Sequence, residues 1–190
     1  MFSLAAPGSA RGASGIISSL LVLGGTRSGK SAYAESVVRA AGPTSLYLAT
    51  ATAGDAEMAE RIRHHRDRRG DGWVTVEEPL DLAGTLATLA QPDRPILVDC
   101  LTLWLSNLME HGTEIAIETA RLVEALPRLA GPVVFVSNEV GLGIVPDNAL
   151  AREFRDHAGR LNQAVAAAVD AVVFVAAGLP LILKPAAGAA

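Results

Sequence analysis

A glycine-rich segment near the amino end of the chain has the spacing of a phosphate-binding loop. Residues 24–31 read Gly-Gly-Thr-Arg-Ser-Gly-Lys-Ser, which fits a glycine, four free positions and then Gly-Lys-Ser. Glycines let successive backbone N–H groups converge on phosphate oxygens, Lys30 would neutralise the terminal phosphates, and the Ser31 hydroxyl would bind Mg²⁺. The segment therefore predicts a nucleoside triphosphate site with contacts at Gly24, Gly25, Thr26, Arg27, Ser28, Gly29, Lys30 and Ser31.

A carboxylate that suits the same site is Asp99, the last residue of the apolar run Ile96-Leu97-Val98-Asp99. In nucleotide-binding α/β proteins an aspartate in this position helps to hold a magnesium ion. Aspartate at the end of a strand is also a common structural cap. The pairing with the glycine-rich loop favours the first interpretation, so Ser31 and Asp99 are the predicted metal ligands.

A third candidate is the segment 61–69, which reads Arg-Ile-Arg-His-His-Arg-Asp-Arg-Arg. On a helix, His65 shares a face with the apolar Ile62, whereas His64 falls among the arginines. A neutral imidazole is a nucleophile toward phosphorus, and nearby arginines would stabilise the phosphoryl charge and keep the ring unprotonated. The residues alone leave two interpretations open: nucleotidyl transfer to His65, or a solvated basic helix face with a core histidine.

The apolar pattern predicts the elements that bring these groups together. Short apolar runs occur at residues 20–23, 45–50, 73–76, 95–99, 133–137 and 172–175, with an edge strand at 181–183. Most are continuous rather than alternating, which is typical of strands buried on both faces. Helical spacing follows at 31–41 and, most clearly, at 147–169. The alternation predicts an α/β fold, a three-layer sandwich like that of the P-loop NTPases with a mainly parallel central sheet.

Length and composition narrow the class of protein. The chain has 190 residues, 50% of them hydrophobic, which suffices for one domain with a full core. Residues 1–19 are small and polar and are expected to be a disordered leader, leaving 20–190 as a single domain. The net charge of −4 argues against a nucleic-acid partner, and uncharged runs are too short for a membrane span. The lone Cys100 cannot form an internal disulfide, so a cytoplasmic location is expected.

Taken in order, several motifs resemble the bifunctional adenosylcobinamide kinase / adenosylcobinamide-phosphate guanylyltransferases of cobalamin biosynthesis. They are the loop at 24–31, Tyr47-Leu48-Ala49-Thr50, the histidine-containing stretch 57–65, the stretch 98–108 that begins Val98-Asp99-Cys100, and the stretch 137–163 that begins Ser137-Asn138-Glu139. A phosphate loop alone is generic, but these motifs in this order are specific. The similarity spans about residues 20–184, which is nearly all of the chain outside the expected leader.

The resemblance implies two successive reactions. The terminal phosphate of ATP or GTP is first moved to the hydroxyl of the aminopropanol arm of adenosylcobinamide. GMP from GTP is then carried on a histidine, which corresponds to His65, and passed to the new phosphate to give adenosylcobinamide-GDP. The resemblance also implies bound Mg²⁺, a corrinoid substrate, a homotrimer, and nucleotide contacts at Ala49, Thr50, Ala51, Arg66, Asp67, Arg68, Arg69, Glu77 and Asp99.

Two other functions stay open on the residues themselves. One is a small-molecule kinase of the P-loop type without guanylyl transfer, and the other is a nucleotide-binding module that switches a partner. Asn138 and Glu139 end a buried run before a glycine-rich stretch, which suits either substrate binding or turn formation. Arg152 and Arg155 are weaker candidates for contacts with the corrinoid or with phosphate.

Overall fold

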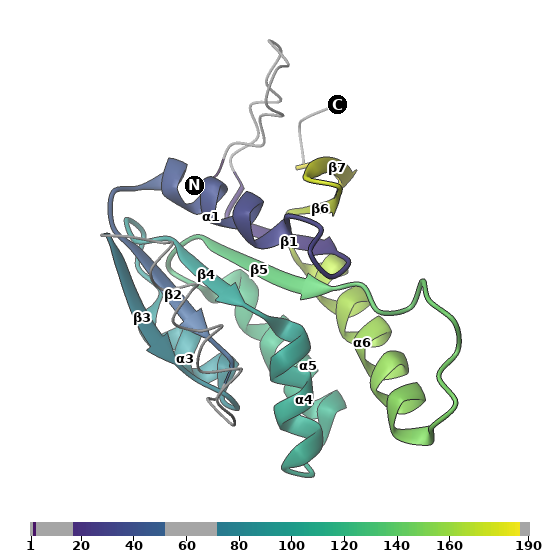
Figure 1. Ribbon diagram of the computed structural model, residues 1–190. Coiled ribbons are helices and arrows are strands. Elements are labelled where there is room, and N and C mark those ends of the chain that lie inside the picture. Colours follow the sequence, from purple (N-terminus) through teal and green to yellow (C-terminus); the bar gives the residue numbers. More distant parts are fainter. Residues whose placement is uncertain (1, 3–16, 52–71, 187–190) are drawn as a thin grey trace.

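The computed structural model describes Phe2 and residues 17–51 and 72–186. Its centre is a seven-stranded sheet with the order β3-β2-β4-β5-β1-β6-β7 (Figure 1). All neighbouring strands are parallel except β6 and β7, which are antiparallel. The strands are β1 Ser19–Gly24, β2 Ser45–Ala49, β3 Trp73–Glu77, β4 Ile96–Asp99, β5 Val133–Asn138, β6 Ala171–Ala176 and β7 Leu179–Lys184.

The continuous apolar runs form the middle of this sheet, as the sequence predicted. Every residue of β1 is buried, and so are the first five residues of β5 beside it. Branched and aromatic side chains on both faces of a strand require cover on both faces, and this sheet has it. The edge strand β7 is mostly exposed, which fits its position at the end of the sheet.

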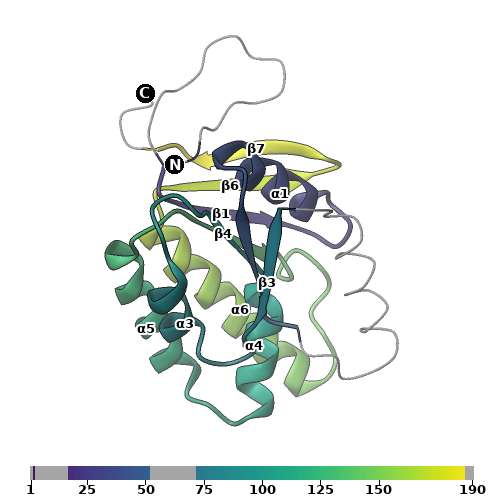
Figure 2. The same cartoon turned by 90° about the vertical axis from the view of Figure 1, so that its left-hand side faces the viewer.

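Helices lie on both faces of the sheet and complete three layers (Figure 2). Helix α1 covers one face and packs with the inner side chains of β1, β5 and β6. The other face is covered by α3, α4, α5 and α6, whose apolar side chains form the second core cluster around Trp104 and Phe135. Their bounds are α1 Lys30–Ala41, α3 Leu82–Leu89, α4 Leu101–Glu110, α5 Ile115–Ala125, the 3-10 helix η1 Leu126–Arg128 and α6 Ala149–Ala168. The predicted α/β sandwich is confirmed.

Four positions of the expected leader are described, Phe2 and residues 17–19. Ser19 is the first residue of β1, and Phe2 and Ile17 form an antiparallel bridge in which the Phe2 amide donates to the Ile17 carbonyl at 3.0 Å. Both apolar side chains are buried in the layer beneath α1. Because each fills space in the core, these residues belong to the folded part of the chain.

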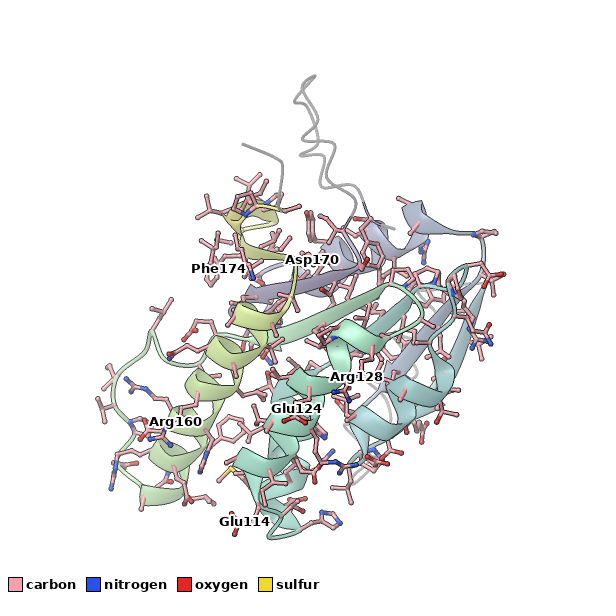
Figure 3. The ribbon with its side chains drawn as sticks, turned by 180° about the vertical axis from the view of Figure 1, so that it is seen from behind. Glu114, Glu124, Arg128, Arg160, Asp170 and Phe174 are labelled. Carbon is pink, nitrogen blue, oxygen red and sulfur yellow. The ribbon has the colours of Figure 1, made fainter. Side chains whose placement is uncertain are left out.

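Hydrogen bonds connect the start of β1 to the turn that follows α6. An oxygen of Asp170 accepts hydrogen bonds from the Ser18 and Ser19 amides, both at 2.8 Å (Figure 3). On the other side of this turn the Lys184 ammonium of β7 donates to the carbonyls of Ala166 and Ala167 at 3.0 Å. A cation at the carboxyl end of a helix is favourable because the last carbonyls have no helical partner. No helix of the described part of the chain is long and apolar enough to cross a bilayer.

Candidate active site

The predicted site residues gather where the parallel strands end. Gly24 at the end of β1 is in register with Asn138 of β5, and Ala49 at the end of β2 is in register with Asp99 of β4. Since β5 lies between β1 and β4, Asn138 separates the glycine-rich loop from Asp99. In open α/β sheets ligands bind at this carboxyl edge, so the arrangement marks the candidate site.

The glycine-rich loop joins β1 to α1 in a shape that depends on its glycines. A Cβ added to Gly24 would lie 2.5 Å from the Ser28 Oγ and 2.6 Å from the carbonyl oxygen of Val175. Gly29, the residue before α1, has a φ of 95°, a backbone conformation that strains any other residue. The loop therefore follows the sheet edge more closely than side chains would allow.

Two further features prepare the loop for an anionic ligand. The Ser28 carbonyl accepts a hydrogen bond from the Gly178 amide at 2.8 Å, so the turn between β6 and β7 holds the loop in place. The Ser28 hydroxyl oxygen is buried and has no hydrogen-bond partner among the described residues. An unsatisfied donor beside the amino end of a helix suits a phosphate group.

Lys30 is buried at the start of α1, with 9% of its surface exposed. Its ammonium donates to the Gly25 carbonyl at 3.1 Å. Burial lowers the pKa of Lys30, while the neighbouring Cys100 and Asp99 act in the opposite direction. Burial also raises the pKa of the Cys100 thiol to about 11, so near neutral pH Asp99 is the neighbour that carries charge. A bound polyphosphate would stabilise the charged lysine further.

Asp99 lies half-buried beside Lys30, and the Tyr47 hydroxyl donates to its Oδ2 at 3.1 Å. The described residues contain no group of three His, Cys, Asp or Glu side chains that could hold a metal ion by themselves. Mg²⁺ at nucleotide sites uses only one or two protein ligands and takes the rest from phosphates and water. The carboxylate of Asp99 and the hydroxyl of Ser31, in the first turn of α1, therefore fit this ion.

A buried polar cluster behind the site joins the ends of β2 and β4. The Thr50 hydroxyl donates to the Cys100 carbonyl at 2.7 Å and accepts from the Cys100 amide at 2.9 Å. From α4, the Asn107 carboxamide donates to the carbonyls of Thr50 at 2.7 Å and Pro79 at 3.1 Å. The cluster fixes the backbone of Cys100, which follows Asp99, and of Thr50, whose amide donates to the Asp99 carbonyl at 3.3 Å. Sequence analysis did not single out Asn107 as functional, although a polar residue among the apolar ones of this helix was a signal.

A second polar pair orients Asn138. The Thr102 hydroxyl oxygen accepts hydrogen bonds from the Asn138 amide at 2.7 Å and from its side-chain Nδ2 at 3.2 Å. The next residue, Glu139, donates its amide to the Gly24 carbonyl at 3.1 Å. The carboxamide of Asn162 on α6 in turn donates to the Asn138 carbonyl at 3.3 Å. Asn138 is thus held between the loop, α4 and α6.

The remaining predicted contacts divide into those near the loop and the end of β2, one on the edge strand β3, and those outside the described residues. Ala49 is buried at the edge and Ala51 is half-buried just beyond it, whereas Thr26 and Arg27 of the loop are exposed. Glu77 pairs with Ala49 but lies one strand further from the loop. The third group lies outside the described residues and stays a prediction; it comprises His65, Arg66, Asp67, Arg68 and Arg69, with His64 beside them.

Comparisons with known proteins place this geometry in context. Residues 20–183 match the model of the family described as cobinamide kinase / cobinamide phosphate guanyltransferase. A bifunctional adenosylcobalamin biosynthesis protein, CobP of Pseudomonas aeruginosa, is 49% identical over 86% of this chain and 96% of its own. The bifunctional adenosylcobalamin biosynthesis protein CobU of Salmonella typhimurium is 43% identical over 87% of this chain and 99% of its own. CobU of Escherichia coli is 39% identical over the same shares.

Solved structures with little sequence similarity share the fold. The flagellar accessory protein FlaH of Methanocaldococcus jannaschii superimposes with a TM-score of 0.51 at 9% identity, covering 90% of this chain and 80% of its own. An ATPase of a bacterial type III secretion system gives 0.50 at 13% identity, covering 86% and 51%. At such identities the likeness shows the fold alone.

Proposed function

Because the chain belongs to the cobinamide kinase / cobinamide phosphate guanyltransferase family, we propose that it carries out both reactions of that name with the residues described above. The kinase reaction moves the terminal phosphate of ATP or GTP to the aminopropanol hydroxyl of adenosylcobinamide. The guanylyl transfer then joins GMP from GTP to the new phosphate and releases pyrophosphate. The observation that carries the site assignment is the buried Lys30 beside Asp99, at the edge where the glycine-rich loop begins.

In the kinase step the protein mainly positions and neutralises charge. Phosphoryl transfer passes through a loose transition state, which needs alignment and cations more than covalent help. Lys30 exchanges the Gly25 carbonyl for phosphate oxygens, and the loop amides and the free Ser28 hydroxyl donate to the same group. Ser31 and Asp99 would hold Mg²⁺, which supplies positive charge to the phosphates when bound.

In the guanylyl step we assign the nucleophile to His65. An imidazole nitrogen attacks the α-phosphorus of GTP, a P–N bond forms, and pyrophosphate leaves. An oxygen of the substrate phosphate then attacks the same phosphorus, the P–N bond breaks, and the imidazole is regenerated. Dividing one difficult displacement between two easier ones is the usual benefit of a covalent intermediate. Arg66, Arg68 and Arg69 would stabilise the phosphoryl charge.

Trapping of the covalent intermediate tests this proposal. The protein is incubated with GTP labelled at the α-phosphate and then denatured. We expect a label on the protein that is stable to alkali and labile to acid, lost in His65→Ala and retained in His64→Ala. Label that persists in His65→Ala would overturn the assignment. A protein that phosphorylates adenosylcobinamide but never takes up label would be a kinase alone, and one that does neither would fit a nucleotide-dependent switch.

We also propose a homotrimer, as the family resemblance implies. The edge strand β7 supports an association of some kind, since Leu179, Leu181, Ile182 and Leu183 are between 45% and 71% exposed. Light scattering on the wild type and on Leu181→Asp tests this. A wild type with the mass of a single chain would overturn the proposal.

A further inference from the structure

An open groove lies at the end of the helical layer that is far from the sheet edge. It has a volume of about 790 Å³ and is formed by the end of α4, the start of α5 and the first turns of α6. Its floor is apolar, with Met109, Ile115 and Phe154. A groove of this size and character is typical of a site for an organic ligand. Among the described residues, none of those discussed above as nucleotide or metal contacts lines it.

The segment between β5 and α6 connects the groove with the candidate active site. This apolar loop, residues 139–148, starts at Glu139, whose amide bonds the Gly24 carbonyl, and ends at the first turn of α6 (Figure 1). Leu142, Ile144 and Val145 of the loop are 83%, 97% and 63% exposed. Leu150, which also lines the groove, is 66% exposed. Such a run of exposed apolar side chains marks a binding surface.

The distance from the groove to the sheet edge can be worked from α6. Asn162 of α6 bonds the Asn138 carbonyl at the edge, and the groove residues Leu150 to Phe154 precede it by two to three helical turns. At 1.5 Å per residue this amounts to roughly 12–18 Å. In cobinamide about seven bonds separate the corrin ring from the aminopropanol hydroxyl, or roughly 9 Å when extended. With the width of the ring added, the substrate spans this distance.

The charge of the groove also fits the substrate. Adenosylcobinamide carries a net positive charge, because the 3+ charge of cobalt(III) is larger than the summed negative charge of the corrin ring and the adenosyl carbon. Its amide side chains are neutral. Glu110 and Glu153 line the groove, and no lysine or arginine of the described ranges lies in its wall. Glu114 lies at the same end of the helical layer (Figure 3). Arg152, the nearest basic residue in the sequence, instead donates to the carbonyls of Pro146 and Asp147.

An arginine lies between the groove and the sheet edge. Arg155 precedes Asn162 by seven residues, so both are on the same side of α6. Its Nη1 is buried and has no hydrogen-bond partner among the described residues. A buried guanidinium nitrogen without a partner suits a phosphate. A phosphorylated aminopropanol arm that runs along α6 would bring its phosphate past this position.

We propose that the groove and the apolar loop bind the corrin ring of the cobinamide substrates, with the aminopropanol arm running along α6 to the carboxyl edge of the sheet. The inference rests on the proposed function, since the family supplies the substrate class and the structure supplies the place. One ring position then serves both reactions, and only the end of the arm changes chemically.

Kinetics of groove variants test the proposal. Ala151→Trp fills the groove, and Glu153→Lys reverses a charge within it. We expect each to raise the KM for adenosylcobinamide about tenfold, with kcat and the affinity for a GTP analogue unchanged. The matched controls on α5, Ile117→Trp and Glu124→Lys, are exposed and outside the groove, and they should leave the KM within a factor of two. Thermal denaturation shows whether each variant is folded.

The outcomes separate this inference from the proposed function. A wild type that phosphorylates adenosylcobinamide, with folded groove variants of unchanged KM, would overturn the groove and leave the function intact. A wild type that neither binds nor phosphorylates adenosylcobinamide would overturn both. If light scattering shows that Ala151→Trp changes the oligomeric state while corrinoid affinity persists, the groove is a subunit contact and the proposal is wrong.

Discussion

The buried Asn107 offers a quantitative test of how the site is held. Its side chain is 8% exposed, and its Nδ2 donates to the carbonyls of Thr50 and Pro79. Replacing it with leucine keeps the volume but leaves both carbonyls without this donor. A buried group that loses its partner costs about 1–3 kcal/mol, and Pro79 is only half-buried, so we expect a loss of about 2–4 kcal/mol in the free energy of unfolding. For a domain of this size that corresponds to a Tm lower by roughly 5–15 °C.

The assay is urea and thermal unfolding of Asn107→Leu beside a matched control. Thr88→Val is suitable, because it removes an exposed hydrogen bond from Thr88 to the Gly84 carbonyl on α3. The control should change the free energy of unfolding by less than about 0.5 kcal/mol. A loss below about 1 kcal/mol in Asn107→Leu would refute the reasoning, since the carbonyls would then have found other partners. We also expect a lower kcat for the kinase reaction in the folded variant. The Thr50 amide donates to the Asp99 carbonyl, so a shift of Thr50 would also displace Asp99.

Three further predictions concern the loop and the phosphate. Because burial lowers the pKa of Lys30, the unfolded chain binds more protons than the nucleotide-free folded protein between the lowered pKa and the ordinary value near 10.5. The free energy of unfolding of the wild type should therefore increase, relative to that of Lys30→Met, as the pH rises through that window. Denaturant titrations at several pH values measure this difference, and a decrease with rising pH would contradict the assignment. Gly24→Ala places a methyl group against the Val175 carbonyl, so we expect at least tenfold weaker binding of a GTP analogue by calorimetry, and unchanged affinity would show that the loop can shift. Arg155→Met should raise the KM for adenosylcobinamide phosphate in guanylyl transfer about tenfold and leave the KM for adenosylcobinamide nearly unchanged; equal effects on both would exclude a phosphate contact.

The sheet could be predicted from the sequence because its strands are buried on both faces. Such strands are short, continuous apolar runs, and seven of them were found within one or two residues of their observed ends. The bridge between Phe2 and Ile17 was missed because neither residue belongs to a periodic segment. The helices α3, α4 and α5 were not delimited. The first has only eight residues, and the other two begin after Cys100 and Glu114 without a side-chain cap.

The sequence named candidate ligands for the site, but it did not name the residues that hold them in place. The spacing of the loop and the position of Asp99 at the end of an apolar run are local features, so both could be recognised in the sequence. In the structure both lie at the carboxyl edge of the sheet. The hydrogen bonds of Thr50 to Cys100 join residues fifty positions apart, and those of Asn107 join α4 to two strand ends. No local pattern encodes such contacts. The groove between α4 and α6 could not be predicted for the same reason.

The place of β1 in the sheet has a consequence for synthesis of the chain on the ribosome. Although β1 is made first, both of its neighbours, β5 and β6, come from the last third of the chain. The loop after β1 is also held by the Gly178 amide. A nascent chain that ends before β5 therefore leaves both edges of β1 open, and long-range pairings of this kind form late. Nucleotide binding should emerge only when translation is almost complete, so prematurely terminated products cannot compete with the finished enzyme for GTP.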